Sequence, residues 1–221
     1  MRRLLLLAFF FVLIFQAKGQ EFTPNINDLV DETQRTSSAS EEINLVWWIP
    51  VEFWEISLQN DPSMTKAQLA EFINVLENYT MIGVIDGKIG AFGGITYTSR
   101  EDIQKNLNII STSGKKLVPL WDDDIDPDAQ NLISMLKPVF ANMLGNMGEN
   151  LQMYMFSGYE DGKVRVADPT EKGNFVVNLK DIVFDWKLPL GSLMPPKKCP
   201  EDGEMMSGNW SFCPWHGKAL E

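Results

Sequence analysis

Histidine and cysteine are nearly absent from this chain of 221 residues, which contains one histidine and two cysteines. The histidine is His216, three residues after Cys213 and close to the C-terminal end. Catalytic triads and histidine acid/base pairs need an imidazole in the main body of a fold. The GxSxG nucleophile motif is also missing. The sequence therefore gives no support to histidine-dependent or GxSxG-type enzymes.

Positive charge is scarce, because 19 lysines and arginines face 30 aspartates and glutamates, for a net charge of −11. Nucleic acids and anionic lipid surfaces are bound through clustered cations. We therefore expect neither of them as a partner. The acidic surface suits a soluble extracytoplasmic protein, or one that meets cations.

The apolar run Leu4–Phe15 is too short to cross a bilayer, which takes about 20 residues. Two arginines precede it, and Ala17 and Gly19 supply the small residues that favour cleavage after Gly19. We expect residues 1–19 to be a secretory signal peptide. The mature protein should then be exported, to a periplasm or the extracellular space, with no stable membrane anchor.

Composition divides the remainder into three parts. Residues 20–42 are polar and are predicted to form a flexible leader. Residues 43–194 carry most of the large apolar side chains and should form the main domain, which resembles no enzyme family. Pro195 and Pro196 should act as a stiff hinge into a small module at residues 195–221.

Two helices are predicted by their N-terminal signals. Thr65 is a good N-cap, and Gln68 three residues later completes a capping box. Asp126 followed by Pro127 pairs an N-cap with the proline that the first helical position favours. Gly145 suits the end of that second helix.

Clusters of β-branched and aromatic residues predict the strands. Pro50 should divide residues 43–58 into two strands. Asp86-Gly87 should form a tight hairpin turn, and residues 151–188 a four-stranded meander. The predicted class is α+β, with a mainly antiparallel sheet, two or three helices and the small C-terminal module.

The C-terminal module contains a repeat, because Cys-Pro-x-x-Gly begins at Cys199 and again at Cys213. The third position after each cysteine is a possible ligand, Asp202 in one copy and His216 in the other. Two matching turns of this kind can present four side chains to one tetrahedral metal ion. The repeat resembles the zinc-ribbon family, whose halves commonly read Cys-Pro-x-Cys-Gly. The resemblance covers residues 199–217 only, and this chain departs from the pattern at Asp202 and His216.

The resemblance implies a structural zinc ion bound by Cys199, Asp202, Cys213 and His216, with no open position for a substrate. Two alternatives stay open. Export would permit a Cys199–Cys213 disulfide instead. The module could also be a ribbon that has lost its metal and kept its shape.

Carboxylates elsewhere suggest a second function. Glu52 and Glu55 lie among aromatic residues, as carboxylates do in sugar-binding clefts, although on a strand they would point to opposite faces. Five aspartates over Asp122–Asp128 partly resemble a calcium loop, but they suit a helix N-terminus better. We expect an exported, non-enzymatic binding or structural protein. The alternative is a carboxylate-dependent hydrolase of a polysaccharide or similar polymer.

Overall fold

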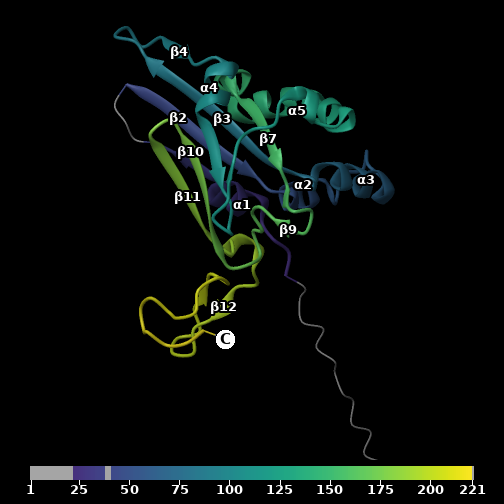
Figure 1. Ribbon diagram of the computed structural model, residues 1–221. Coiled ribbons are helices and arrows are strands. Elements are labelled where there is room, and N and C mark those ends of the chain that lie inside the picture. The colour runs from purple at the N-terminus through teal and green to yellow at the C-terminus, as the bar shows by residue number, and fades with distance from the viewer. Residues whose placement is uncertain (1–21, 38–40, 221) are drawn as a thin grey trace, which may run out of the picture.

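The computed structural model describes residues 22–37 and 41–220, so the predicted signal peptide lies outside the described residues. The described part contains five α-helices (Figure 1). They are α1 (Ile26–Thr33), α2 (Val51–Leu58), α3 (Lys66–Leu76), α4 (Arg100–Asn106) and α5 (Pro127–Leu144). The α+β class with antiparallel sheets is confirmed, with more helices than the two or three predicted. No helix among the described residues has both the length and the apolar character needed to cross a bilayer.

The larger sheet is built around one long strand. Its strands are β1 (Gln34–Thr36), β2 (Glu42–Ile49), β3 (Tyr79–Ile89), β4 (Ile95–Tyr97) and β7 (Gln152–Ser157). β2 pairs antiparallel along one edge of β3, and β7 and β4 pair in succession along the other edge. Both edges of β3 are therefore covered over most of its length.

A second antiparallel sheet packs against the first. It has the order β11 (Ile182–Leu188), β10 (Gly173–Leu179), β5 (Leu107–Ile110) and β6 (Lys116–Leu117). Two small hairpins complete the strands, β8 (Tyr159–Glu160) with β9 (Val164–Arg165), and β12 (Lys197–Lys198) with β13 (Met205–Met206). The β12–β13 hairpin belongs to the C-terminal module, below the sheets in Figure 1.

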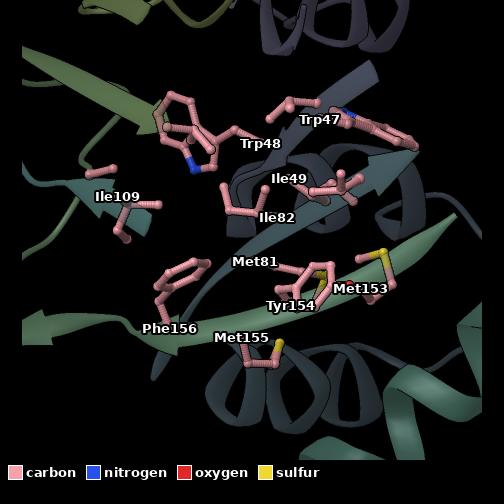
Figure 2. Packing of buried hydrophobic residues seen from close by; sticks show 14 of the residues in the cluster. Trp47, Trp48, Ile49, Met81, Ile82, Ile109, Met153, Tyr154, Met155 and Phe156 are labelled. Carbon is pink, nitrogen blue, oxygen red and sulfur yellow. The ribbon is translucent and has the colours of Figure 1, made fainter. Parts of the chain in front are cut away.

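Adjacent tryptophans on β2 join the layers of the domain. Successive side chains of a strand point to opposite faces, and Trp47 and Trp48 lie on different sides of the sheet in Figure 2. Trp47 meets Phe53 of α2 and Phe140 of α5 edge to face. Trp48 packs on Phe175 of the second sheet, with ring centroids 4.9 Å apart. The larger sheet thus lies between a helical layer and the second sheet.

The segment predicted to be a flexible leader contains α1 and β1. Leu29 and Thr33 of α1 are fully buried, and the indole of Trp47 donates a hydrogen bond to Thr33 Oγ1 at 3.1 Å. β1 pairs with β2. The prediction was wrong for residues 26–36 because their polar composition conceals one buried face on a short helix.

The second predicted strand after Pro50 is helix α2. Pro50 has extended backbone dihedrals and lies at the N-cap, so it ends β2 and directly precedes the helix. Only Phe53 and Trp54 of α2 are buried, and Trp54 packs on Phe72 of α3 and on the ring of Phe140. Helical packing therefore overrides the strand propensity of this aromatic segment.

The predicted hairpin at Asp86-Gly87 is also wrong, because both residues lie inside β3 opposite β2. The chain turns instead between Gly90 and Gly94, where Gly93 has a positive φ of 80°. The four strands predicted as one meander are divided among three sheets, since β7 joins β3 and β9 pairs with β8.

Asp86 explains why β3 continues through this position. Its carboxylate is 3% exposed. It accepts a hydrogen bond from the amide of Asn44 at 2.6 Å and from the ammonium of Lys180 at 2.5 Å. Lys180 lies in the turn between β10 and β11, with a positive φ of 55°. This ion pair therefore ties the two sheets together at a buried carboxylate.

Candidate metal centre

Two turns of identical geometry form the centre of the C-terminal module. The amide of Gly203 donates to the carbonyl of Cys199 at 2.9 Å, and that of Gly217 to Cys213 at 2.8 Å. Both glycines have positive φ, 79° and 62°, a conformation that side-chain-bearing residues adopt at a cost. The glycine in each Cys-Pro-x-x-Gly copy therefore closes the turn that its cysteine begins.

The structural repeat extends beyond the sequence motif. Lys198 pairs with Met205 in the first hairpin, and Phe212 pairs with Ala219, fourteen residues later in each case, in the second. Four buried residues form the small core of the module. They make two pairs with the same spacing of fourteen residues, Cys199 with Cys213 and Met206 with Leu220. The module therefore consists of two equivalent hairpins that pack through matching positions.

His216 lies between the two cysteines. Its Nδ1 atom is 3.4 Å from Sγ of Cys199 and 3.5 Å from Sγ of Cys213. One ligand atom from each residue lies within 4.8 Å of the other two, so these three residues form a group that could hold a metal ion. The cysteines are buried, and the histidine lies at the exposed side of the group.

Asp202, the fourth predicted ligand, stands beside this group and is not one of its three members. Its Oδ2 atom is 3.7 Å from Nδ1 of His216, while its Oδ1 atom accepts the amide of Glu204 at 3.0 Å. The Glu204 amide and a side-chain hydrogen bond with Cys199 lower the pKa of Asp202. The carboxylate is therefore ionised at neutral pH and held at the border of the site.

Backbone amides point at both sulfur atoms. Burial raises the pKa of the Cys199 thiol, and the amides of Asp202 and Glu201 oppose that effect. Burial acts in the same direction on Cys213, but the amides of His216 and Trp215 help to outweigh it, so that pKa is lowered. Amide donors stabilise a thiolate, which is the form that binds metal.

The disulfide alternative is not what the structure contains. Cys199 and Cys213 are both free and buried, and the imidazole of His216 faces both sulfurs. The pKa of His216 is raised, first by its hydrogen bond with Cys213 and also by the charge of Asp202. The side chains of a simple bridge would have no need of this arrangement.

The module packs closely on the main domain. A Cβ atom on Gly208 would lie 2.6 Å from Cβ of Met194, the last residue of the main domain, and 2.3 Å from the carbonyl oxygen of Pro195, so glycine is required for this approach. The side chain of Asn209 donates to the carbonyl of Pro189 at 3.0 Å. The segment at Pro195 and Pro196, predicted to be a hinge, is thus in contact with the module that follows it.

The other carboxylates singled out by sequence lie in two separate places. Glu52 and Glu55 are three residues apart on helix α2, where they share a face, which corrects the expectation of opposite faces. Glu52 forms a two-pronged ion pair with Arg165 at 2.7 and 3.3 Å. Burial and the charge of Glu52 raise the pKa of Glu55.

This ion pair leaves little space for a substrate. The hollow lined by Arg165, Glu77 and Tyr79 has a volume of about 10 Å³, which is room for one water molecule at most. Trp47 and Trp54, the aromatic residues expected beside such a cleft, are buried in the core. We therefore interpret the ion pair of Glu52 and Arg165 as a structural contact between α2 and β9.

Asp122–Asp124 form a short 3-10 helix, η1, and Asp126 and Asp128 lie at the start of α5, so the interpretation as a helix N-terminus is confirmed for these last two aspartates. Asp126 is the N-cap and accepts the amide of Asp128 at 2.8 Å. Asp122 lies 3.4 Å from the guanidinium of Arg100. Neither of these contacts brings Asp122–Asp128 to the carboxylates of α2.

Sequence reasoning missed Met206 and Leu220, which complete the core of the module. The fourteen-residue spacing, extended past each glycine, would have found them. No family model, curated protein or solved structure matches this chain. The functional conclusions therefore rest on the geometry of the chain itself.

Proposed function

We propose that this protein is an exported, non-enzymatic binding or structural protein whose C-terminal module folds around one zinc ion. Cys199, Cys213 and His216 supply three ligands, and Asp202 supplies the fourth. The observation that carries the proposal is the position of His216 Nδ1, 3.4 and 3.5 Å from the two sulfurs.

The spacing of the three ligand atoms suits zinc. Sulfur and nitrogen atoms bound at about 2.3 and 2.1 Å at tetrahedral angles stand roughly 3.6 Å apart. Both measured distances to His216 Nδ1 fall within about 0.2 Å of that value. Thiolate and imidazole together favour zinc over the hard cations calcium and magnesium.

Asp202 is the best-placed fourth ligand. Its carboxylate is close to both His216 and Cys199, which places an oxygen ligand beside the three-residue group. Four protein ligands close the coordination sphere, which is typical of a structural ion and not of a catalytic one. Zinc would then hold together a module whose own core has four residues.

A binding role is supported by the surface of the same module. Several large apolar side chains are exposed there, Trp215 at 74%. These residues are Met205, Trp210, Phe212 and Trp215. Methionine and aromatic residues are enriched in protein interfaces, and a rigid module would present them with little loss of entropy on binding.

The direct test is a metal analysis of the purified protein. We expect about one equivalent of zinc per chain by plasma emission spectrometry, and two reactive thiols after chelation under denaturing conditions without reductant. Cobalt exchanged into the site should give the visible absorption of a tetrahedral thiolate complex. Protein with no bound metal and no titratable thiols would show a disulfide, and the proposed zinc site would be wrong.

Export is tested separately. Expressed in its own host, the protein should be recovered outside the cytosol with Gln20 at its N-terminus, because the charged start, apolar run and small residues favour cleavage after Gly19. N-terminal sequencing of the exported fraction measures this. A chain that begins at Met1 in the cytosolic fraction would contradict the proposed location and leave the metal site unaffected.

A further inference from the structure

Helices α3 and α5 enclose an apolar groove with a volume of about 540 Å³. Eight of the side chains that line it are apolar, with two amides and two carboxylates among the rest. The apolar side chains are Leu58, Met64, Phe72, Val75, Leu132, Met135, Leu136 and Val139. This surface is separate from the proposed zinc site.

Most apolar side chains of these two helices are partly buried against the core, and the faces beside the groove are open to solvent chiefly at Met135 and Val139. Leu76 is the one fully buried residue of α3, and Ala129 and Phe140 are the only ones of the eighteen in α5. Met135 and Val139, one turn apart on α5, are 71% and 47% exposed. These two side chains form a small exposed apolar surface bordered by polar groups, and methionine is enriched where proteins bind one another.

Charge restricts the kind of partner. Among the residues that the structure describes, the charged ones in the lining are Glu71 of α3 and Asp128 of α5, and no lysine or arginine lines the groove. The Asp122–Asp128 segment adds further carboxylates at the same end of α5. An apolar groove with acidic borders complements a segment that carries apolar side chains on one face and cations beside them.

We propose that the groove between α3 and α5 binds an amphipathic helix with large aliphatic side chains on one face and lysines or arginines on its flanks. A groove between two helices accepts a third helix through residues spaced three and four apart. Met64 and Met135 can adapt to the shape of such side chains. The proposal rests on the proposed binding role but not on the metal, so chelation should leave this binding intact.

The test uses three fluorescein-labelled synthetic peptides of eighteen residues. One has leucines at helical spacing with lysines on the opposite face, the second has glutamates in place of the lysines, and the third is a scrambled leucine-lysine sequence. Fluorescence anisotropy at physiological salt measures binding to the intact protein. We expect saturable binding of the first peptide, at least about tenfold tighter than either of the others.

The groove is then changed at an exposed position. Met135→Lys places a cation in the groove without burying it, and should weaken binding of the leucine-lysine peptide at least about tenfold. Val183→Lys on β11 is the matched control, because Val183 is 63% exposed and does not line the groove. It should leave binding unchanged.

Three outcomes would overturn the proposal. Equal binding of the scrambled peptide would show attraction to acidic surface charge alone. Unchanged binding by Met135→Lys, with circular dichroism confirming the fold, would place the peptide elsewhere. Sedimentation showing that the protein alone is a dimer, which Met135→Lys converts to a monomer, would make the groove an interface between copies of this chain.

Discussion

Zinc affinity is expected to fall by more than about 100-fold when Cys199 is replaced by serine. Loss of a partner outside the coordination sphere already costs 10–100-fold, and this substitution removes a thiolate ligand itself. The sulfur is buried beside His216 and Cys213, so no other side chain of the module can take its place. Competition with a chromogenic chelator measures the change.

A substitution of Asp202 should raise the zinc affinity, in contrast to the loss expected for Cys199→Ser. Asp202→Cys restores the Cys-Pro-x-Cys-Gly pattern and replaces a hard oxygen with a thiolate, so zinc affinity should rise. Ser211→Ala is the control, because this exposed residue is not a member of the ligand group, and it should leave affinity unchanged. Equal affinity of Cys199→Ser and the unaltered protein would rule out the proposed centre.

Metal loss should affect the module more than the domain. Hydrogen exchange in the Cys199→Ser variant should increase over residues 197–220, whose own core has four residues. The two sheets and their tryptophan core do not depend on the module for burial. Increased exchange throughout both sheets would instead show that the ion stabilises the entire fold.

Lys180→Met should destabilise the domain by about 2 kcal/mol, less than for a fully buried ion pair because the Lys180 side chain is 39% exposed. The substitution removes the ammonium that pairs with the carboxylate of Asp86, which is 3% exposed and keeps only the amide of Asn44 as a partner. Removing Lys180 leaves the buried carboxylate of Asp86 without a compensating charge. The free energy lost in this way is larger than the net contribution of the ion pair itself. Urea denaturation followed by tryptophan fluorescence measures the difference.

Two further variants separate the charge effect from lost packing. Lys187→Met on the exposed face of β11 is the matched control and should change stability by less than about 0.5 kcal/mol. Adding Asp86→Asn to Lys180→Met removes the stranded charge and should recover part of the loss. A denaturation midpoint for Lys180→Met equal to that of Lys187→Met would show that water replaces the ammonium.

Those parts of the fold with local signals could be predicted from the sequence. The capping box of Thr65 and Gln68 forms as expected, with both of its reciprocal bonds. Helix α5 begins after Asp126 and ends at Gly145, whose φ is 59°. Caps satisfy backbone groups within one turn, so neighbouring residues are sufficient to specify them.

Tertiary contacts decided the parts that could not be predicted. Residues 51–58 have strand propensity, and only the packing of Trp54 on Phe72 and Phe140 explains their helix. Asp86-Gly87 has the composition of a turn, but the lysine that holds Asp86 in the sheet lies 94 residues later. No local pattern carries that information.

The candidate metal site also has a part that could be predicted from the sequence and a part that could not. A fixed spacing of fourteen residues identified Cys199, Cys213 and His216, because each turn is a local structure closed by its own glycine. The position of the Asp202 carboxylate was not predictable, since it depends on contacts of its two oxygens, Oδ1 with the amide of Glu204 and Oδ2 with His216. The spacing of the repeat places Asp202 near the site, but the rotation of its side chain determines whether the carboxylate is a ligand.

Glu32 at the end of α1 has a mechanical consequence. Its carboxylate accepts the amides of Gly191 and Ser192 at 3.0 and 2.8 Å, and its carbonyl accepts the indole of Trp186 at 3.0 Å. The two bonds to the carboxylate join the segment before the sheets directly to the segment after them and are strengthened by its charge, while the Trp186 bond ties α1 to β11. Tension applied between α1 and the C-terminal module would therefore act first on these hydrogen bonds of Glu32. The strands of both sheets would bear the load only after the bonds had broken.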